Sequence, residues 1–252
     1  MPLRPADIPE FYENAYAPTA DAERHGRWRA MSAVAKAEHV TALARRIGCD
    51  APGVVAEVGC GDGAVLGELG RRGFGTTRVG FEISAAAVAI AAERPEIDEA
   101  AVFDGSRLPA ADGAYDLAFA THVLEHVPAP APLLREMMRV ARAVVVEVPL
   151  ERNISARRPA ARAMSEAAGH VQRFDRAAIR RLVTDAGWQV RGEIVDPLGA
   201  EVHLFGRRSP AARAKGRAKW AVRRALAVSP ALGTRLVTMH YALIATPPGG
   251  AA

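Results

Sequence analysis

Residues 54–66 read VVAEVGCGDGAVL and form the most specific pattern in the chain. A short β-branched strand ends in Glu57 and Val58 and runs into glycines at 59, 61 and 63 before a helix begins. Glycine permits positive φ and a close approach of the backbone to a ligand, here at a helix N-terminus expected to be rich in free N–H donors. The stretch therefore predicts a site for a carboxylate- or phosphate-bearing ligand.

Short β-branched runs alternate with alanine-rich helical stretches after this loop. We expect strands at 54–58, 77–82, 100–103, 115–120, 143–148, 188–195 and 240–246. This alternation indicates βαβ units around a parallel sheet, that is, a doubly wound α/β fold. Residues 1–50 show no strand pattern and are expected to form a helical cap whose first helix is N-capped by Asp7. Residues 51–252 are expected to form the main domain.

About forty residues separate the last two expected strands, too many for a hairpin loop, so 197–238 are interpreted as a helical insertion. No acidic residue follows Glu201, whereas nine basic residues do: Arg207, Arg208, Arg213, Lys215, Arg217, Lys219, Arg223, Arg224 and Arg235. Such a tract attracts phosphates, anionic substrates or acidic membrane surfaces, or simply keeps a helix solvated. A narrow alanine stripe is expected to pack on the domain rather than enter lipid, namely Ala214, Ala218, Ala221 and Ala225.

Composition indicates the class of protein and its expected location in the cell. Half of the 252 residues are hydrophobic, which suffices for a sizeable core. The N-terminus lacks the apolar segment of a secretory signal, and the longest apolar run, 85–92, falls far short of the ~20 residues of a membrane span. Cys49 and Cys60 are the only cysteines, too few for a cysteine metal site, and a disulfide at Cys60 would distort the glycine loop. A reducing, cytoplasmic location with at most peripheral membrane contact is expected.

The glycine loop alone does not identify its ligand. Gly59, Gly61 and Ala64 also fit the G-x-G-x-x-G/A pattern of dinucleotide-binding folds. Glu82 ends the second strand 23 positions after Gly59, where a carboxylate can accept both hydroxyls of a ribose. That placement suits NAD and S-adenosylmethionine alike.

Three features favour S-adenosylmethionine. Glu57 stands where a dinucleotide-binding strand usually carries an apolar residue, and Asp104 with Gly105 ends the third strand, where a carboxylate can accept from an adenine amino group. The third feature is residues 103–127, FDGSRLPAADGAYDLAFATHVLEHV. Here the chain resembles the class I S-adenosylmethionine-dependent methyltransferases, in particular the small-molecule, methyltransferase type 11-like group with its acidic E/D-x-G-x-G-x-G loop, acidic ribose clamp, LP turn and VLEHV-like segment.

The resemblance covers about 54–190 and the strand at 240–246, and it implies a Rossmann-like sheet of seven strands, six parallel and the last antiparallel. By the family pattern the glycine loop and the strand-end acid before it hold the methionine moiety, the next acid holds the ribose, the third holds the adenine, and backbone after the fourth strand holds the amino group. The implied cofactor-binding residues are Glu57, Gly59, Cys60, Gly61, Gly63, Glu82, Ile83, Asp104, Gly105, Thr121 and His122. Singly such residues are turns or solvated acids; their joint occurrence in order favours the methyltransferase interpretation.

Candidate catalytic residues are His126 and His170, because a base is needed if the acceptor is a hydroxyl and histidine titrates near neutral pH. Their alternative roles are a backbone bond at a helix start for His126 and loop ordering for His170. His122, Glu125, His126 and His170 also contain the ligand types of a divalent cation. Some similar methyltransferases bind one through E-x-x-E-H, but His122 replaces the first glutamate of that pattern here, and no metal is expected.

The expected function is methyl transfer to a small molecule, with the oxygen of a sugar, quinone-like or lipid-linked compound as the target. Aromatic residues of the N-terminal helix either close the pocket as a lid or simply pack on the domain: Phe11, Tyr12 and Tyr16. Arginines in the loop expected over the acceptor favour an anionic or phosphate-bearing acceptor, with solvated arginines as the alternative: Arg152, Arg157, Arg158 and Arg162.

Three other functions stay open from the sequence. A nucleic-acid (RNA) methyltransferase would hold phosphates with the basic insertion, although THVLEH lacks the D/N-P-P-Y/F pattern of enzymes that methylate base amino groups. A non-catalytic cofactor-binding scaffold is disfavoured by the complete glycine loop. A dehydrogenase is disfavoured by Glu57 and Asp104. The acceptor, the target atom and the oligomeric state are not determined by the sequence.

Overall fold

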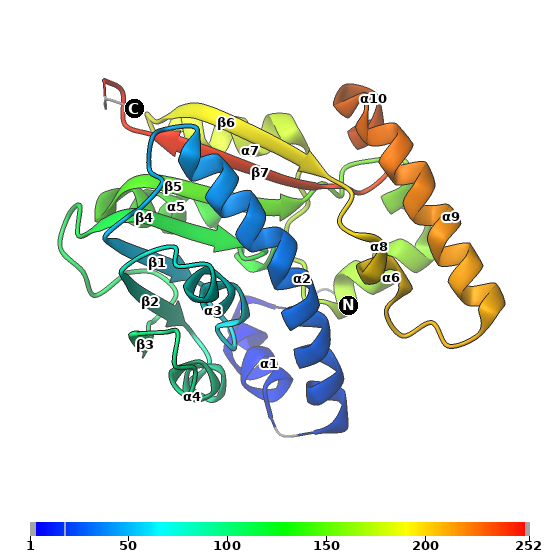
Figure 1. The fold of residues 1–252 in the computed structure, drawn as a ribbon, viewed down its shortest axis with the longest axis horizontal. Helices are drawn as coiled ribbons and strands as arrows, with labels where there is room; N and C mark the ends of the chain where they lie inside the picture. Colours follow the sequence, from blue (N-terminus) through cyan, green and yellow to red (C-terminus); the bar gives the residue numbers. More distant parts are fainter. Residues whose placement is uncertain (1–3, 18, 250–252) are drawn as a thin grey trace.

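The computed structural model describes residues 4–17 and 19–249, and in it seven strands form one sheet in the order β3-β2-β1-β4-β5-β7-β6 (Figure 1). Six strands are parallel, and β7 runs antiparallel to its neighbours β5 and β6. The strands are β1 (Val54–Val58), β2 (Thr77–Glu82), β3 (Glu99–Val102), β4 (Tyr115–Thr121), β5 (Ala141–Pro149), β6 (Gln189–Asp196) and β7 (His240–Thr246). The predicted doubly wound, seven-stranded fold is confirmed.

Helices cover both faces of the sheet, as Figure 1 shows for α2 (Ala20–Arg45), which crosses one face beside α3 (Ala64–Arg71). Buried residues of α2 recur at helical spacing and share a core with that face: Ala33, Ala37, Val40, Leu43 and Ala44. The opposite face carries α5 (Pro130–Val140) and α7 (Arg176–Asp185). Asp175 caps α7 as predicted, because its carboxylate accepts from the amide of Ala178 at 2.8 Å. A shorter helix, α4 (Ala85–Ala92), contacts β2 and β3.

The predicted N-cap role of Asp7 is wrong. The turn η1 (Pro5–Asp7) continues directly into α1 (Ile8–Ala15), so Asp7 has helical φ and ψ of −92° and −8° and makes no side-chain bond to the helix. Its carboxylate pairs with Arg4 instead, at 2.7 Å. What fixes α1 is Glu13, which accepts from the hydroxyl of Ser84 at 2.8 Å and from the amide of Ala86 at the start of α4.

Between β6 and β7 lie three helices, α8 (Ala200–Leu204), α9 (Pro210–Ala227) and α10 (Pro230–Leu236), which confirm the helical insertion. They stand at one side of the molecule (Figure 1). The prediction that the alanine stripe packs on the domain is wrong, since Ala214, Ala218, Ala221 and Ala225 are all exposed. The packed face is marked instead by Gly216 and Trp220.

Gly216 is the buried residue of α9, and an added Cβ there would lie 2.9 Å from the carbonyl oxygen of His203 in α8. Trp220 donates its indole N–H to the carbonyl of Leu198 at 3.1 Å. Gly216 lets α9 approach α8 closely, and Trp220 bonds to the segment just before α8. These two contacts therefore set the orientation of α9.

The chain order places a crevice at the carboxyl ends of β1 and β4. These two strands are neighbours, and the chain leaves them toward opposite sides of the sheet, which is the topological switch point where α/β sheets bind ligands. The segments after β4 and β5 contribute to one wall through η2 (Leu124–His126) and the end of α6 (Pro159–Ala167), whereas η3 (Ser155–Arg157) lies outside the lining. Within residues 4–17 and 19–249, no helix has the length and hydropathy needed to cross a membrane.

Candidate active site

A cavity of about 800 Å³ lies at this switch point. All the predicted cofactor-binding and catalytic residues line it except Gly63. Gly63 is the N-cap of α3 with φ of +71°, and a Cβ there would collide with the side chain of Ile97. Its role is therefore packing and helix entry, whereas the other predicted residues converge on one space.

The glycines of the loop act through their missing side chains, not through free amides. The N–H of Gly59 donates to the carbonyl of Phe81 at 2.7 Å, that of Gly61 to Glu82 at 3.0 Å, and that of Gly63 to the carbonyl of Cys60 at 2.9 Å. The amides of these three glycines are therefore engaged within the protein. A Cβ on Gly59 would lie 2.5 Å from Val123, so the positive φ of +73° comes together with a close contact.

Two acidic side chains, Glu57 and Glu82, end neighbouring strands and line the cavity. Burial raises the pKa of Glu57 well above its usual range, although Lys36 and the amide of Leu66 oppose this. Burial likewise raises the pKa of Glu82, which accepts from the amides of Gly61, Ile83 and Ser84 at 3.0, 2.6 and 3.2 Å. A carboxylate has about four accepting positions, so Glu82 has one left, whereas acceptance from both hydroxyls of a ribose would need two.

Asp104 lies two residues beyond the end of β3 instead of ending the strand. One of its oxygens accepts from the amides of Ser106 and Arg107 and from the Ser106 hydroxyl, at 2.8 to 2.9 Å. These bonds, that of Arg107 foremost, lower the pKa of Asp104. The turn, which includes Gly105 at φ +79°, holds a charged carboxylate at the cavity.

The aromatic residues of the N-terminal segment line the cavity, as the lid interpretation requires: Phe11, Tyr12 and Tyr16. A Cβ on Gly61 would collide with the Tyr16 hydroxyl, so this tyrosine covers the glycine loop. Arg29 of α2 stacks 4.5 Å from the centre of the Tyr16 ring and pairs with Asp62 of the loop at 2.8 Å. The lid is thus fixed to the loop by one cation.

His126 and His170 lie side by side, with ring centres 4.9 Å apart. The Nδ1 of His126 donates to the carbonyl of Gly169 at 3.1 Å, which leaves the lone pair on Nε2. Burial lowers the pKa of His126, despite the nearby Glu125. Burial opposes charge on His170 too, but its hydrogen bond to Glu151 at 2.9 Å raises its pKa. Both alternative roles are therefore present as well: His126 bonds backbone, and His170 orders its loop.

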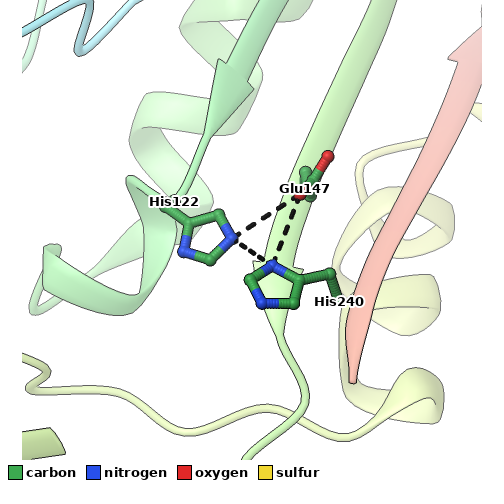
Figure 2. Close-up of side chains that lie close together, drawn as sticks. All are labelled: His122, Glu147 and His240. Carbon is green, nitrogen blue, oxygen red and sulfur yellow. Dashed lines mark hydrogen bonds and ion pairs between the residues drawn. The ribbon is translucent and has the colours of Figure 1, made fainter. Parts of the chain in front are cut away.

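A second cluster of side chains, which the sequence did not single out, lies behind His122. His122 follows β4 with φ of +61° and contacts Glu147 of β5 and His240 of β7 (Figure 2). Of these three residues, only His122 lines the cavity. Sequence reasoning also missed Trp28, Arg29 and Lys36, which bring α2 into the lining.

None of the arginines expected over the acceptor lines the cavity. The segment after β5 contributes Ala167, Ala168 and His170 instead. No residue of α9 or α10 lines it either, so the basic tract lies outside this pocket. The arginine and lysine side chains in the lining, Arg29 and Lys36, both come from α2.

Comparison with known proteins gives a family and a fold. A family profile described as a methyltransferase domain matches residues 27–193. Among curated protein sequences, none matches this chain. The family match begins inside α2 and ends in β6, so it spans the glycine loop, η2 and both catalytic candidates.

Solved structures with the same fold include a Haloferax volcanii complex of a methyltransferase activator with a methyltransferase, at 16% identity and a TM-score of 0.64 over 94% of this chain and 97% of that chain. A magnesium protoporphyrin IX methyltransferase from Synechocystis, with bound SAH, has 14% identity and a TM-score of 0.58 over 94% and 99% of the two chains. Geranyl diphosphate C-methyltransferase from Streptomyces coelicolor has 16% identity and a TM-score of 0.61 over 84% and 77%.

Proposed function

This chain belongs to the methyltransferase-domain family, and we propose that it transfers a methyl group from S-adenosylmethionine to a small-molecule acceptor. The observation that carries the proposal is one cavity lined by acidic groups that lie at or just after the ends of three neighbouring strands, namely Glu57, Glu82 and Asp104. Its volume of about 800 Å³ lies in the range of cofactor and ligand sites, about 300 to 1,000 Å³.

The cavity fits the cofactor. Glu57 and Lys36 place a carboxyl group and an ammonium group in the same lining, which suits the zwitterionic amino-acid end of S-adenosylmethionine. Glu82 has one accepting position left for a ribose hydroxyl, and Asp104 with Gly105 lies where the adenine is proposed to bind. When bound, S-adenosylmethionine supplies a methyl group already activated on a sulfonium sulfur.

The protein contributes water exclusion, alignment and, for a hydroxyl acceptor, a base. Tyr12 and Tyr16 cover the cavity, and Tyr12 packs edge-on against His126 with ring centres 5.6 Å apart. His126 is neutral at pH 7 because burial lowers its pKa, and its Nε2 lone pair can take a proton. His170, whose pKa is shifted the other way by Glu151, acts beside it as a positioning group.

The cavity lining contains many apolar side chains, which points to a hydroxyl group carried on an apolar body, as in a quinone-like or lipid-linked compound. The apolar lining residues include Ile8, Phe11, Val123, Val127 and Leu133. Because the basic insertion and the arginines of 152–162 do not line the cavity, an anionic or nucleic-acid acceptor has less support than an apolar one.

Calorimetric titration with S-adenosylmethionine, S-adenosylhomocysteine and NADH tests the cofactor assignment. We expect micromolar binding of the two sulfur nucleotides and none of NADH. Binding of NADH alone would support a dehydrogenase, and binding of none would support a scaffold. Copurified nucleic acid that high salt releases would favour the RNA alternative, since binding through phosphate contacts of the basic insertion weakens as the salt concentration rises.

A further inference from the structure

A cluster of two partly buried histidines and one buried glutamate lies beside the active-site cavity, and the proposed methyl transfer assigns no role to their side chains. Its members are His122 after β4, Glu147 in β5 and His240 at the start of β7, three neighbouring strands. His122 Nε2 and His240 Nδ1 are 2.6 Å apart, and Glu147 Oε1 lies 3.6 and 3.5 Å from them (Figure 2). Three possible ligand atoms thus face one point.

The Glu147 oxygen that faces the two imidazoles is the strongest sign of a missing partner. The Glu147 side chain is 0% exposed, and its Oε1 has no hydrogen-bond partner among the described residues. A buried, unpartnered carboxylate oxygen is costly, because it has lost water and gained nothing in its place. A cation between Glu147 and the two histidines would supply that partner.

Neighbouring groups hold the cluster as outer-shell partners hold metal ligands. Glu125 Oε1 lies 3.2 Å from the second nitrogen of His122. His39 of α2 donates from Nδ1 to the other Glu147 oxygen at 2.8 Å, and its Nε2 lies 3.5 Å from Asp196. A carboxylate behind a ligating histidine orients the ring and raises its basicity.

We propose that His122 Nε2, Glu147 Oε1 and His240 Nδ1 bind one divalent transition-metal ion of the Zn²⁺ class. Two imidazoles and one carboxylate are a typical Zn²⁺ ligand set, whereas Mg²⁺ and Ca²⁺ prefer oxygen ligands. Bonds of about 2.0–2.2 Å place tetrahedral ligands roughly 3.3–3.5 Å apart, so the two N–O separations already fit and only the two nitrogens must separate. The imidazoles are 14% and 15% exposed, which leaves one side for a fourth ligand.

Such an ion would join the ends of β4, β5 and β7 beside the cofactor site. His122 has a positive φ of +61°, an uncommon conformation for a residue other than glycine. A metal bond at its Nε2 would hold the backbone in this conformation and thereby fix the cavity wall. The proposal does not depend on methyl transfer, so its test and the test of the proposed function can fail separately.

The experiment uses the full, untagged chain, stripped with a chelator and titrated with Zn²⁺ by calorimetry and with Co²⁺ by visible absorption. We expect one ion per chain and the intense d–d bands of four- or five-coordinate Co²⁺. His240→Gln should weaken Zn²⁺ binding at least ~100-fold, and His39→Gln, which removes an outer-shell partner, ~10–100-fold. The matched control is His203→Gln in α8, outside the cluster, which should change affinity less than about twofold.

Two results would overturn the proposal: equal Zn²⁺ affinity in wild type and His240→Gln, or loss of binding in His170→Gln with none in His240→Gln. The second result would place the ion at Glu125, His126 and His170, which also lie close together. Should His240→Gln fail to fold, ¹⁵N-histidine NMR of the wild type decides. Zn²⁺ must shift two imidazoles, one bound through Nε2 and one through Nδ1, and any other pattern contradicts the site.

Discussion

The cavity and the helical insertion both concentrate charge, yet they hold it in different ways. Glu57 and Glu82 are buried at strand ends, and backbone amides fix their carboxylates. The cations on α9, such as Arg213 and Arg217, are exposed, whereas Gly216 and Trp220 hold the helix in place. Convergence of buried, hydrogen-bonded groups therefore indicates function in this chain better than the density of charge does.

The largest expected effect is at His126, because a base acts directly on the reacting group. His126→Asn keeps a donor for the carbonyl of Gly169 at the position of Nδ1 but removes the Nε2 base, and kcat on a hydroxyl acceptor should fall ~10²–10⁴-fold. Steady-state kinetics measure this, while calorimetry should show that S-adenosylmethionine affinity is nearly unchanged. An unaltered kcat would mean that alignment alone suffices and that His126 only bonds backbone.

Glu82→Ala should have the next largest effect, now on cofactor binding. A hydrogen bond to a charged acceptor contributes about 1.5–3 kcal/mol, so the dissociation constant of S-adenosylmethionine should rise ~10–100-fold. Calorimetric titration measures it, with Glu93→Ala as the control because Glu93 is an exposed acid outside the cavity. Equal S-adenosylmethionine affinity of wild type and Glu82→Ala would show that Glu82 does not bind the ribose.

A smaller effect is expected at the largely buried ion pair of His170 and Glu151, in contrast to the exposed charges of α9. His170 faces Glu151, Glu125 and Arg173, and Glu151 raises its pKa against the effect of burial. Because the folded-state pKa is raised, the stability from this pair is fully present below the unfolded value near 6.5 and is lost as the pH rises through the folded value. At acid pH it is lost again when Glu151 is protonated.

Thermal unfolding of wild type and Glu151→Gln should therefore differ most at about pH 5–6 and least in alkaline solution. The expected difference is about 2–4 °C for each kcal/mol that the pair contributes. Glu166→Gln is the control. Glu166 is an exposed acid paired with Arg173 at 3.6 Å, and it lies on α6 next to Ser165, whose hydroxyl donates to Glu151. A difference that stays constant between pH 5 and 9 would show that His170 does not titrate with Glu151.

Local patterns sufficed for the fold and for most of the cavity. Strand ends at Glu57, Glu82 and Thr121 could be placed from short β-branched runs, and a parallel sheet brings such ends to one edge whatever the details of packing. The glycine loop could be located for the same reason. The sequence could not show whether each glycine amide is free or hydrogen-bonded, because the partners Phe81 and Glu82 come from another strand.

Contacts between distant segments escaped prediction. Glu147 and His240 meet because β7 pairs antiparallel with β5, with Pro149 opposite His240, and neither residue has a local pattern of its own. The prediction that the alanine stripe of α9 packs on the domain failed because its spacing defines one face of a helix but does not show which face is buried. A single buried glycine, Gly216, decides that, and its significance depends on α8 lying against it.

The smallest expected effect is on α9, where neutralising Arg213, Lys215, Arg217 and Lys219 together should change both the S-adenosylmethionine affinity and the acceptor KM less than about twofold. Exposed cations outside the cavity contact neither ligand, and their longer-range attraction is screened by salt. Arg29→Ala is the contrasting variant, because Arg29 lines the cavity and holds both Tyr16 and Asp62. If the fourfold variant raised the acceptor KM while Arg29→Ala did not, the insertion would lie on the path of an anionic acceptor, and the contrast between the two regions would be reversed.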